Sequence, residues 1–177
     1  MPETDRQRRR SVRLLGYDYS QAGGYFITIC TQNRRCLFGK IVGDVMLLSD
    51  IGRIVESEWL RTPSFRPQIE LDEFIIMPNH FHAIVLIPDC RGVLQYAPTH
   101  RLVSPSQTIG AIVRGFKGAT TKRINTARGT PGEPVWQRNY YDHVIRNEDD
   151  LAATRGYILN NPPAWALDEE NPGLSRP

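Results

Sequence analysis

Two histidines near the middle of the chain have a spacing that could support metal chemistry. His80 and His82 flank Phe81 at the head of an apolar run of branched residues that ends at Ile87. Such a run predicts a buried strand. Side chains alternate along a strand, so the two imidazoles would share one face with Cβ atoms roughly 6–7 Å apart, close enough to bind one metal ion. Two ordinary histidines at a strand entrance are the alternative.

A second candidate group lies near the C-terminus. Tyr157 and Asn161 are four residues apart in a segment predicted to be helical, so they would share a helix face. Taken singly, the tyrosine could be a surface residue and the asparagine a helix C-cap. Tyr140 and Tyr141 are alternative candidates to Tyr157 for a tyrosine with a chemical role, because strand alternation would turn one of them inward.

The elements that must position these residues can be read from hydrophobic periodicity. The sequence predicts strands at 25–31, 69–77 and 77–87 and a short strand within 135–146, with a small hairpin at 36–48. It predicts helices from Ser49 to about 62, from 106–108 onward, and from Asn147 to about 160, where Pro162 and Pro163 follow. This order predicts an α+β fold, the ferredoxin-like βαββαβ antiparallel sheet with an extra C-terminal helix that carries the tyrosine. The predicted core faces include Leu60 on the first helix and Leu151, Ile158 and Leu159 on the last.

Length and composition favour one soluble domain. The chain has 177 residues, of which 40% are hydrophobic, and no apolar run approaches the roughly 18–20 residues of a membrane span. We expect a flexible basic arm at 1–15, a single domain at 16–162 and a C-terminal tail at 163–177. The three cysteines form no Cys-x-x-Cys pair and the arginine-rich start lacks an apolar signal region, so we expect a cytoplasmic protein with free thiols.

The charge pattern suggests a polyanionic partner. The net charge is +3, and 19 of the 22 basic residues are arginines, which suit bidentate phosphate contacts. A GC-rich genome would also favour arginine, and exposed charges can simply be solvated. The candidate DNA contacts lie on the arm and on the second helix: Arg6, Arg8, Arg9, Arg10, Arg13, Arg114, Lys117, Lys122 and Arg123.

Several motifs occur together in a specific order. The segment Met77-Pro78-Asn79-His80-Phe81-His82 contains a His-hydrophobic-His signature. Other matching segments are 16–19, 25–28, 37–39, 136–138, 142–146 and Tyr157-Ile158-x-x-Asn161-Pro162. Over roughly residues 13–162, this set resembles the REP-associated one-tyrosine transposases, which are relatives of the smallest insertion-sequence transposases and act on single-stranded DNA. The segment 88–105 shows no family pattern.

The resemblance implies roles for particular residues. His80, His82 and Asn161 would bind a divalent metal, Mg²⁺ or Mn²⁺, although some relatives have glutamine at the position of Asn161. Tyr157 would be the nucleophile that forms a 5′-phosphotyrosine intermediate on hairpin-bearing DNA such as REP-like palindromes. His143 could orient a ligand or contact DNA, and a structural role is equally open. Relatives include monomers and homodimers that exchange the tyrosine helix, and both arrangements remain open here.

Two other classes of function compete with a transposase. A non-catalytic single-stranded nucleic-acid-binding protein would explain the arginines but not the four residues of the candidate site together. A metal-dependent hydrolase that uses water would make Tyr157 incidental. A covalent protein–DNA adduct distinguishes the first function from both alternatives.

Overall fold

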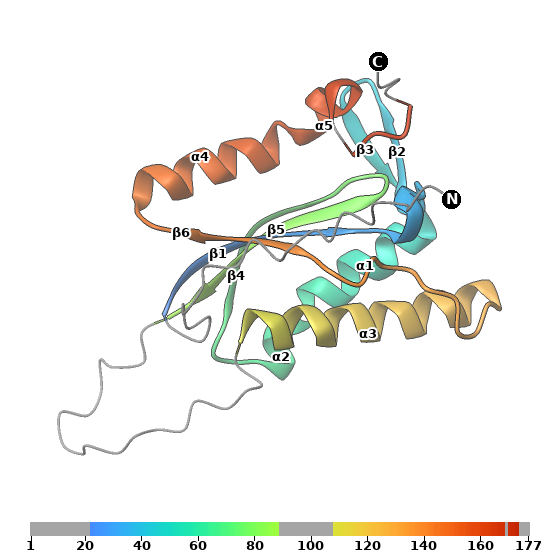
Figure 1. Cartoon of the computed structure of the whole chain (residues 1–177), viewed down its shortest axis with the longest axis horizontal. Helices are drawn as coiled ribbons and strands as arrows, with labels where there is room; N and C mark the ends of the chain where they lie inside the picture. The colour runs from blue at the N-terminus through green and yellow to red at the C-terminus, as the bar shows by residue number, and fades with distance from the viewer. Residues whose placement is uncertain (1–21, 89–107, 169, 174–177) are drawn as a thin grey trace, which may run out of the picture.

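A four-stranded antiparallel sheet forms the centre of the molecule. The computed structural model describes residues 22–88, 108–168 and 170–173. The sheet contains β1 (Gly23–Cys30), β4 (Glu70–Ile76), β5 (His80–Ile87) and β6 (Tyr141–Ile145). The strands lie in the order β4-β5-β1-β6, and every neighbouring pair is antiparallel (Figure 1). The prediction of a mixed fold built on an antiparallel sheet is confirmed.

The two faces of the sheet differ in chemistry because side chains alternate along β1 and β5. Tyr25, Ile27 and Ile29 of β1 belong to the larger apolar core, together with Phe81, Ala83 and Val85 of β5. Phe26 and Ile84 belong instead to a small cluster on the opposite face. The strand that begins at His80 therefore places its histidines on the face with less apolar packing.

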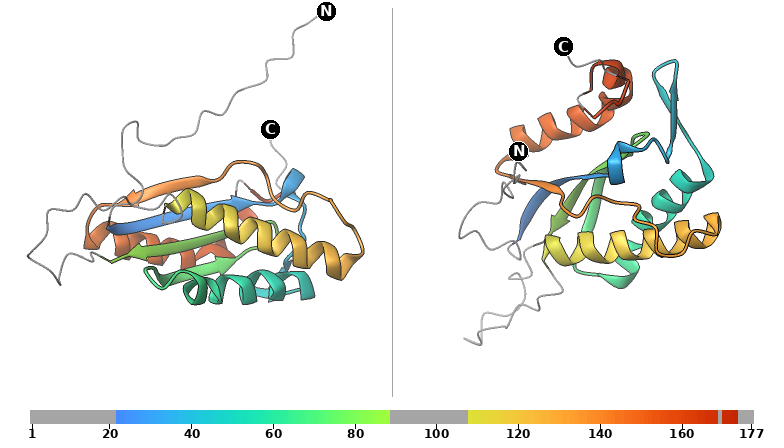
Figure 2. Two further views of the ribbon diagram at one scale, coloured as in Figure 1. Left: turned by 90° about the horizontal axis from the view of Figure 1, so that it is seen from below. Right: turned by 45° about the vertical axis from the view of Figure 1, so that its right-hand side comes forward.

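Two helices cover the apolar face. They are α1 (Asp50–Leu60), followed by the short α2 (Thr62–Phe65), and α3 (Ile109–Arg128). Figure 2 shows α1 and α3 side by side against the sheet. The Ser49 and Thr108 side chains cap the first turns of α1 and α3, as short hydroxyl side chains commonly do. The ring centroids of Trp59, Phe81 and Phe116 lie within 5.3 Å of one another, a spacing typical of packed aromatic pairs.

One helix, α4 (Glu148–Leu159), lies over the opposite face. Asn147 caps it, and three acidic residues in its first turn suit the helix dipole. Its one buried residue is Ile158. An ion pair between Arg155 and Asp72 of β4 attaches the helix to one edge strand, and a polar contact between Asp150 and His143 of β6 attaches it to the other. Polar contacts therefore contribute substantially to the attachment of α4 to the sheet.

A small hairpin of β2 (Gly39–Val42) and β3 (Val45–Leu48) stands beside the sheet, after the short η1 (Gln32–Arg34). Gly43 and Asp44 both have positive φ at its turn, as the favoured two-residue hairpin turn requires. Beyond α4, the chain continues through α5 (Asn161–Ala164) and η4 (Trp165–Leu167). The contact between β3 and α5 brings the hairpin near the C-terminal segment.

Three expectations are corrected by the structure. Leu60 and Leu159 are mostly exposed rather than in the core. Leu159 follows the buried Ile158, and successive residues project about 100° apart around a helix, so one of the two faces away from the sheet. The region predicted as a tail contains the end of α5 and all of η4. Pro162 and Pro163 lie in the first turn of α5, where proline is tolerated.

Other expectations fall outside the described residues. The arm at 1–15, with Arg6, Arg8, Arg9, Arg10 and Arg13, lies in the part that is not described, as does most of the segment 88–105. Within the described residues, no helix combines the length and apolar character needed to cross a membrane.

Candidate active site

Two histidines of β5 lie together on the sheet face beneath α4. Their ring centroids are 4.5 Å apart, and both side chains are buried. In the sheet register, His82 lies opposite Thr28 of β1 and Ile75 of β4, while His80 lies opposite Cys30. The predicted sharing of one face follows from this alternation, since Phe81 between them enters the core on the other side.

Each imidazole is held through its Nδ1 atom. Thr28 Oγ1 lies 2.8 Å from His82 Nδ1, and Asn79 Oδ1 lies 2.9 Å from His80 Nδ1. The Asn79 amide nitrogen donates to the carbonyl oxygens of Arg34 and Glu170. The Asn79 oxygen therefore faces His80 as an acceptor, so His80 Nδ1 carries the hydrogen and Nε2 keeps its lone pair.

Three of the buried polar atoms that lack a hydrogen-bond partner among the described residues belong to this site and could bind a metal ion. They are His80 Nε2, His82 Nε2 and Asn161 Oδ1. An unpartnered buried polar atom is costly, and two imidazole nitrogens with an amide oxygen form a set suited to a divalent metal ion. In the described part of the chain, no group of three or more His, Cys, Asp or Glu side chains could hold a metal. The candidate site depends on the amide of Asn161 as its third member.

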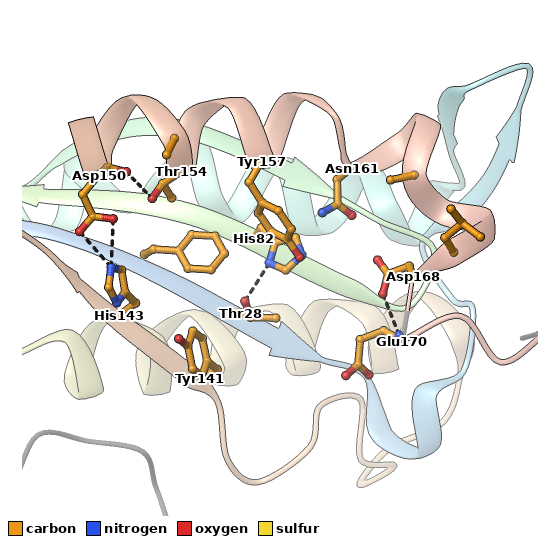
Figure 3. Close-up of a pocket in the computed structure, with 14 residues that line it drawn as sticks. Thr28, His82, Tyr141, His143, Asp150, Thr154, Tyr157, Asn161, Asp168 and Glu170 are labelled. Atoms are coloured by element: carbon orange, nitrogen blue, oxygen red, sulfur yellow. Dashed lines mark hydrogen bonds and ion pairs between the residues drawn. The ribbon is translucent and has the colours of Figure 1, made fainter. Parts of the chain in front are cut away.

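Tyr157 lies directly over this group. Its ring centroid is 5.3 Å from that of His82 and 5.9 Å from that of Phe26. The side chain is 52% exposed, so the phenol is accessible from solvent. Figure 3 shows Tyr157 pointing from α4 towards His82, with Asn161 beside it. The spacing of four residues brings the pair together as predicted, although α4 ends at Leu159 and Asn161 is the first residue of α5.

Burial keeps the titratable groups of the site neutral. It lowers the pKa of His80 to about 4. Burial, and secondly the neighbouring His80, lower the pKa of His82 well below its usual value. Burial raises the pKa of the Tyr157 phenol, and a hydrogen bond with Asn161 only partly offsets this. At neutral pH the imidazoles are therefore unprotonated, as metal binding requires, and the phenol keeps its proton.

A cleft of about 860 Å³ runs past these residues. His82, Tyr157 and Asn161 line its middle, His143 and Asp150 lie at one end, and Asp168 and Glu170 lie at the other (Figure 3).

The competing tyrosines and His143 occupy distinct positions. Tyr140 packs against the larger core beneath the Lys117 ammonium, whereas Tyr141 is exposed and lines the cleft. His143 Nε2 lies 3.0 Å from a carboxylate oxygen of Asp150. This pair joins β6 to α4, so the observed partner of His143 is a residue of the tyrosine helix. Its predicted role beside the candidate metal ligands stays a prediction.

The predicted basic surface of α3 lies on the far side of the sheet from the cleft (Figure 1). Lys117 donates to the carbonyl oxygens of Gln137, Arg138 and Asn139, and Arg123 pairs with the buried Glu58. Both side chains thus have structural partners. Arg114 and Lys122 are exposed, and DNA contact by any of the four remains a prediction.

Sequence reasoning missed three residues of this region. Thr28 could have been found from its strand, because an alternating strand beside the histidine strand must place some side chain opposite His82. Asn79 belongs to the matched motif, but the sequence alone assigns it no role at the site. Asp168 lies 3.7 Å from His80 Nε2 through its Oδ2 atom, and no local pattern signals this contact.

Comparisons with known proteins give the relationships of the chain. No protein-family model matches it. A Haemophilus influenzae protein described as uncharacterized is 44% identical over 167 residues, which are 91% of this chain and 92% of that protein. Another Haemophilus influenzae protein, named "Putative REP-associated tyrosine transposase", is 24% identical over 145 residues, or 82% of this chain and 73% of that protein.

A solved structure has a similar fold. It is that of a REP-associated tyrosine transposase bound to a REP hairpin, with a TM-score of 0.56 and 22% identity; the match covers 83% of this chain and 70% of that one. At this identity the likeness establishes the fold alone. The chain belongs to one family with the 44%-identical Haemophilus influenzae protein, and its predicted resemblance to the REP-associated tyrosine transposases is confirmed.

Proposed function

We propose that this protein is a metal-dependent transposase that cuts and rejoins single-stranded DNA through a 5′-phosphotyrosine intermediate. One observation carries the proposal: three buried, unpartnered donor atoms lie beneath an accessible tyrosine. A non-catalytic nucleic-acid-binding protein would have no need to bury such atoms together. The sequence relative named as a transposase supports the same class of activity.

The fold supplies a rigid base for this chemistry. In the sequence order β1-α1-β4-β5-α3-β6, with the sheet order β4-β5-β1-β6, we infer the ferredoxin-like βαββαβ plan with the tyrosine on the added helix α4. The histidines project from a central strand, which fixes their positions better than a loop would. Only α4 and the segment after it need to adjust when DNA enters the cleft.

His80 Nε2, His82 Nε2 and Asn161 Oδ1 fit a divalent metal ion, Mg²⁺ or Mn²⁺. Thr28 and Asn79 orient the imidazoles so that both lone pairs remain available. A metal ion bound there would polarise the scissile phosphate and offset its negative charge. Because the two imidazoles and the amide are neutral, they leave an uncompensated positive charge that favours a phosphate in the cleft.

Tyr157 would perform the covalent step. Its phenol oxygen would bond to phosphorus while the bond from phosphorus to the 3′-oxygen breaks, and the phenol proton would leave to water or to the departing oxygen. The product is a tyrosyl 5′-phosphate and a free 3′-hydroxyl, so the reverse attack rejoins the strand without ATP. The raised pKa of Tyr157 means that this proton must be removed as the attack occurs.

The proposed DNA is a single strand next to a hairpin, because one tyrosine handles one strand at a time. The solved relative is described as bound to a REP hairpin, and we extend that class of DNA to this chain. Monomeric and dimeric action both fit a site whose residues come from one chain.

The test is the formation of a covalent adduct. A labelled single-stranded hairpin DNA is incubated with the protein and Mn²⁺, and a denaturing gel separates protein-linked DNA from free DNA. We expect an adduct with the natural chain and none with Tyr157→Phe, while Tyr141→Phe serves as the matched control. Cleavage without an adduct would establish a water-using hydrolase, and binding without cleavage would establish a non-catalytic DNA-binding protein.

A further inference from the structure

An exposed tyrosine lies on the floor of the cleft, apart from the candidate metal ligands. Tyr141 is the first residue of β6, is 46% exposed and lines the cleft. Its ring meets that of Phe26 edge-on, with the two centroids 6.4 Å apart. An edge-on contact covers at most one face of a ring, so a flat apolar surface of Tyr141 stays open to the cleft.

The sheet register sets Tyr141 in line with the histidine site. Thr28 of β1 lies opposite His82 on one side and opposite Tyr141 on the other, and Figure 3 shows Thr28 between the two rings. Directly opposite side chains in a sheet project to the same face. Because neighbouring strands are about 4.8 Å apart, Tyr141 lies about 10 Å from His82 on the same wall of the cleft.

The charges of the cleft wall do not suit a row of phosphates. Neither lysine nor arginine is found among the described residues that line it, whereas three carboxylate side chains are: Asp150, Asp168 and Glu170. Carboxylates repel phosphates, and proteins hold the phosphate backbone mainly with lysine and arginine. Apart from the scissile phosphate of the proposed function, we therefore expect a DNA strand to face this wall with its bases.

Three phenyl or phenol rings belong to the described lining of the cleft, and they differ in accessibility. Phe26 is only 8% exposed, and the ring of Tyr157 lies over it with the centroids 5.9 Å apart. Tyr157 is the nucleophile of the proposed function, so its oxygen must approach phosphorus. Tyr141 is the exposed ring without that constraint. Stacking of bases on such rings is a common way to hold a single strand, and it tolerates different base sequences.

We propose that Tyr141 is a base-stacking residue that holds one nucleotide of the single-stranded DNA close to the cleaved bond. The inference rests on the proposed function for the identity of the ligand, but it makes a separate claim: the ring of Tyr141, not its hydroxyl group, binds the base. The bases of a duplex are already stacked on one another, so this contact favours a single strand over a duplex.

The test measures DNA affinity with and without the ring. The natural chain, Tyr141→Phe and Tyr141→Ala are each titrated into a labelled hairpin DNA with a single-stranded flank, without a divalent ion, and fluorescence anisotropy gives the Kd. We expect Tyr141→Ala to raise the Kd about 5–150-fold, the range for loss of one stacked base. Tyr141→Phe should keep the natural Kd because the ring remains. The salt dependence should be equal in all three, since the ring neutralises no phosphate.

Removing bases from the DNA identifies the stacked nucleotide. In a series of the same DNA, one nucleotide of the flank at a time is made abasic. At one position, the abasic DNA should bind the natural chain more weakly than the intact DNA does, while Tyr141→Ala should bind both equally. Such non-additivity shows that the ring and the base contribute to one shared interaction.

Controls separate this effect from general damage. Phe65→Ala removes an exposed ring from α2, on the other side of the sheet, and should keep the natural Kd. Melting temperatures check the fold, and if Tyr141→Ala is unstable, Tyr141→Leu takes its place, because leucine keeps apolar volume without a flat ring. The same rise in Kd is expected.

The outcomes distinguish this inference from the proposed function. Natural affinity in Tyr141→Ala, or an equal loss in Tyr141→Phe, would overturn base stacking, while an adduct formed by the natural chain would leave the proposed function standing. The expected loss of affinity without any adduct would instead keep the stacking residue in a non-catalytic DNA-binding protein. If the natural chain does not bind the hairpin DNA, both proposals are overturned.

Discussion

The hydroxyl of Thr28 gives the sharpest test of how the histidines are positioned. Thr28→Val replaces the side chain with one of nearly the same shape and removes only the partner of His82 Nδ1, which lies 2.8 Å away. Both residues are on central strands in direct register, so the backbone should not move. The substitution should therefore affect mainly the orientation of the His82 imidazole.

The size of the effect follows from burial. His82 is 3% exposed, so water cannot readily replace the lost partner. Leaving a buried polar atom unpaired costs about 1–3 kcal/mol in the free energy of unfolding. Removing the residue that orients a metal-binding histidine typically lowers metal affinity or activity about 10–100-fold. We expect Thr28→Val to show both losses.

The assay combines Mn²⁺ titration with single-turnover cleavage of hairpin DNA at saturating protein. Thr126→Val is the matched control, since its hydroxyl bonds only the Lys122 carbonyl oxygen on an exposed part of α3. If Thr28→Val keeps natural metal affinity and cleavage rate, the hydroxyl does not position His82 for metal binding, and the assignment of the bare Nε2 atom as a ligand loses its support.

Three further outcomes test other parts of the structure. Burial lowers the pKa of His80 from 6.5 to about 4, so between these pH values the unfolded chain binds more protons than the folded chain. The free energy of unfolding without metal, measured by urea denaturation, should therefore fall as the pH drops from about 6.5 towards 4. Arg155→Asp should slow single-turnover cleavage more than it weakens DNA binding, and the added Asp72→Arg should restore part of the rate if their ion pair positions α4. Lys117→Met should lower the melting temperature while leaving the salt dependence of DNA binding unchanged, because the ammonium holds three backbone carbonyls; a flatter salt dependence would instead show a phosphate contact.

Local chemistry explains what the sequence could predict. The strand from His80 to Ile87 follows from branched apolar residues, and the caps at Ser49 and Asn147 follow from side chains that accept bonds from nearby backbone N–H groups. The facing of His80 and His82 required only the alternation of a strand. These signals lie within a few residues of the structure that they determine.

The remaining features depend on contacts between distant segments. Asp168 comes near His80 because Asn79 binds the Glu170 carbonyl, 91 residues away in sequence. Likewise, the charge of Lys117 suggested DNA, but its partners lie 20–22 residues further along the chain. A basic residue on an amphipathic helix looks the same in sequence whether it binds phosphate or caps a neighbouring loop.

The two faces of the sheet differ: one packs against the large apolar core, and the other carries the candidate active site. On one face, α1 and α3 bury a continuous core that includes Trp59 and Phe116, so any displacement would expose large apolar surfaces. On the other face, α4 buries only Ile158 and contacts the edge strands through the Arg155–Asp72 ion pair and the polar contact between Asp150 and His143. Partly exposed ion pairs exchange with water or phosphate at little cost. The proposed nucleophile, Tyr157, thus lies on the helix with the smaller apolar contact, while His80 and His82 lie on a central strand of the sheet. Exchanging the charges of Asp72 and Arg155 tests whether their ion pair positions this helix for the proposed reaction.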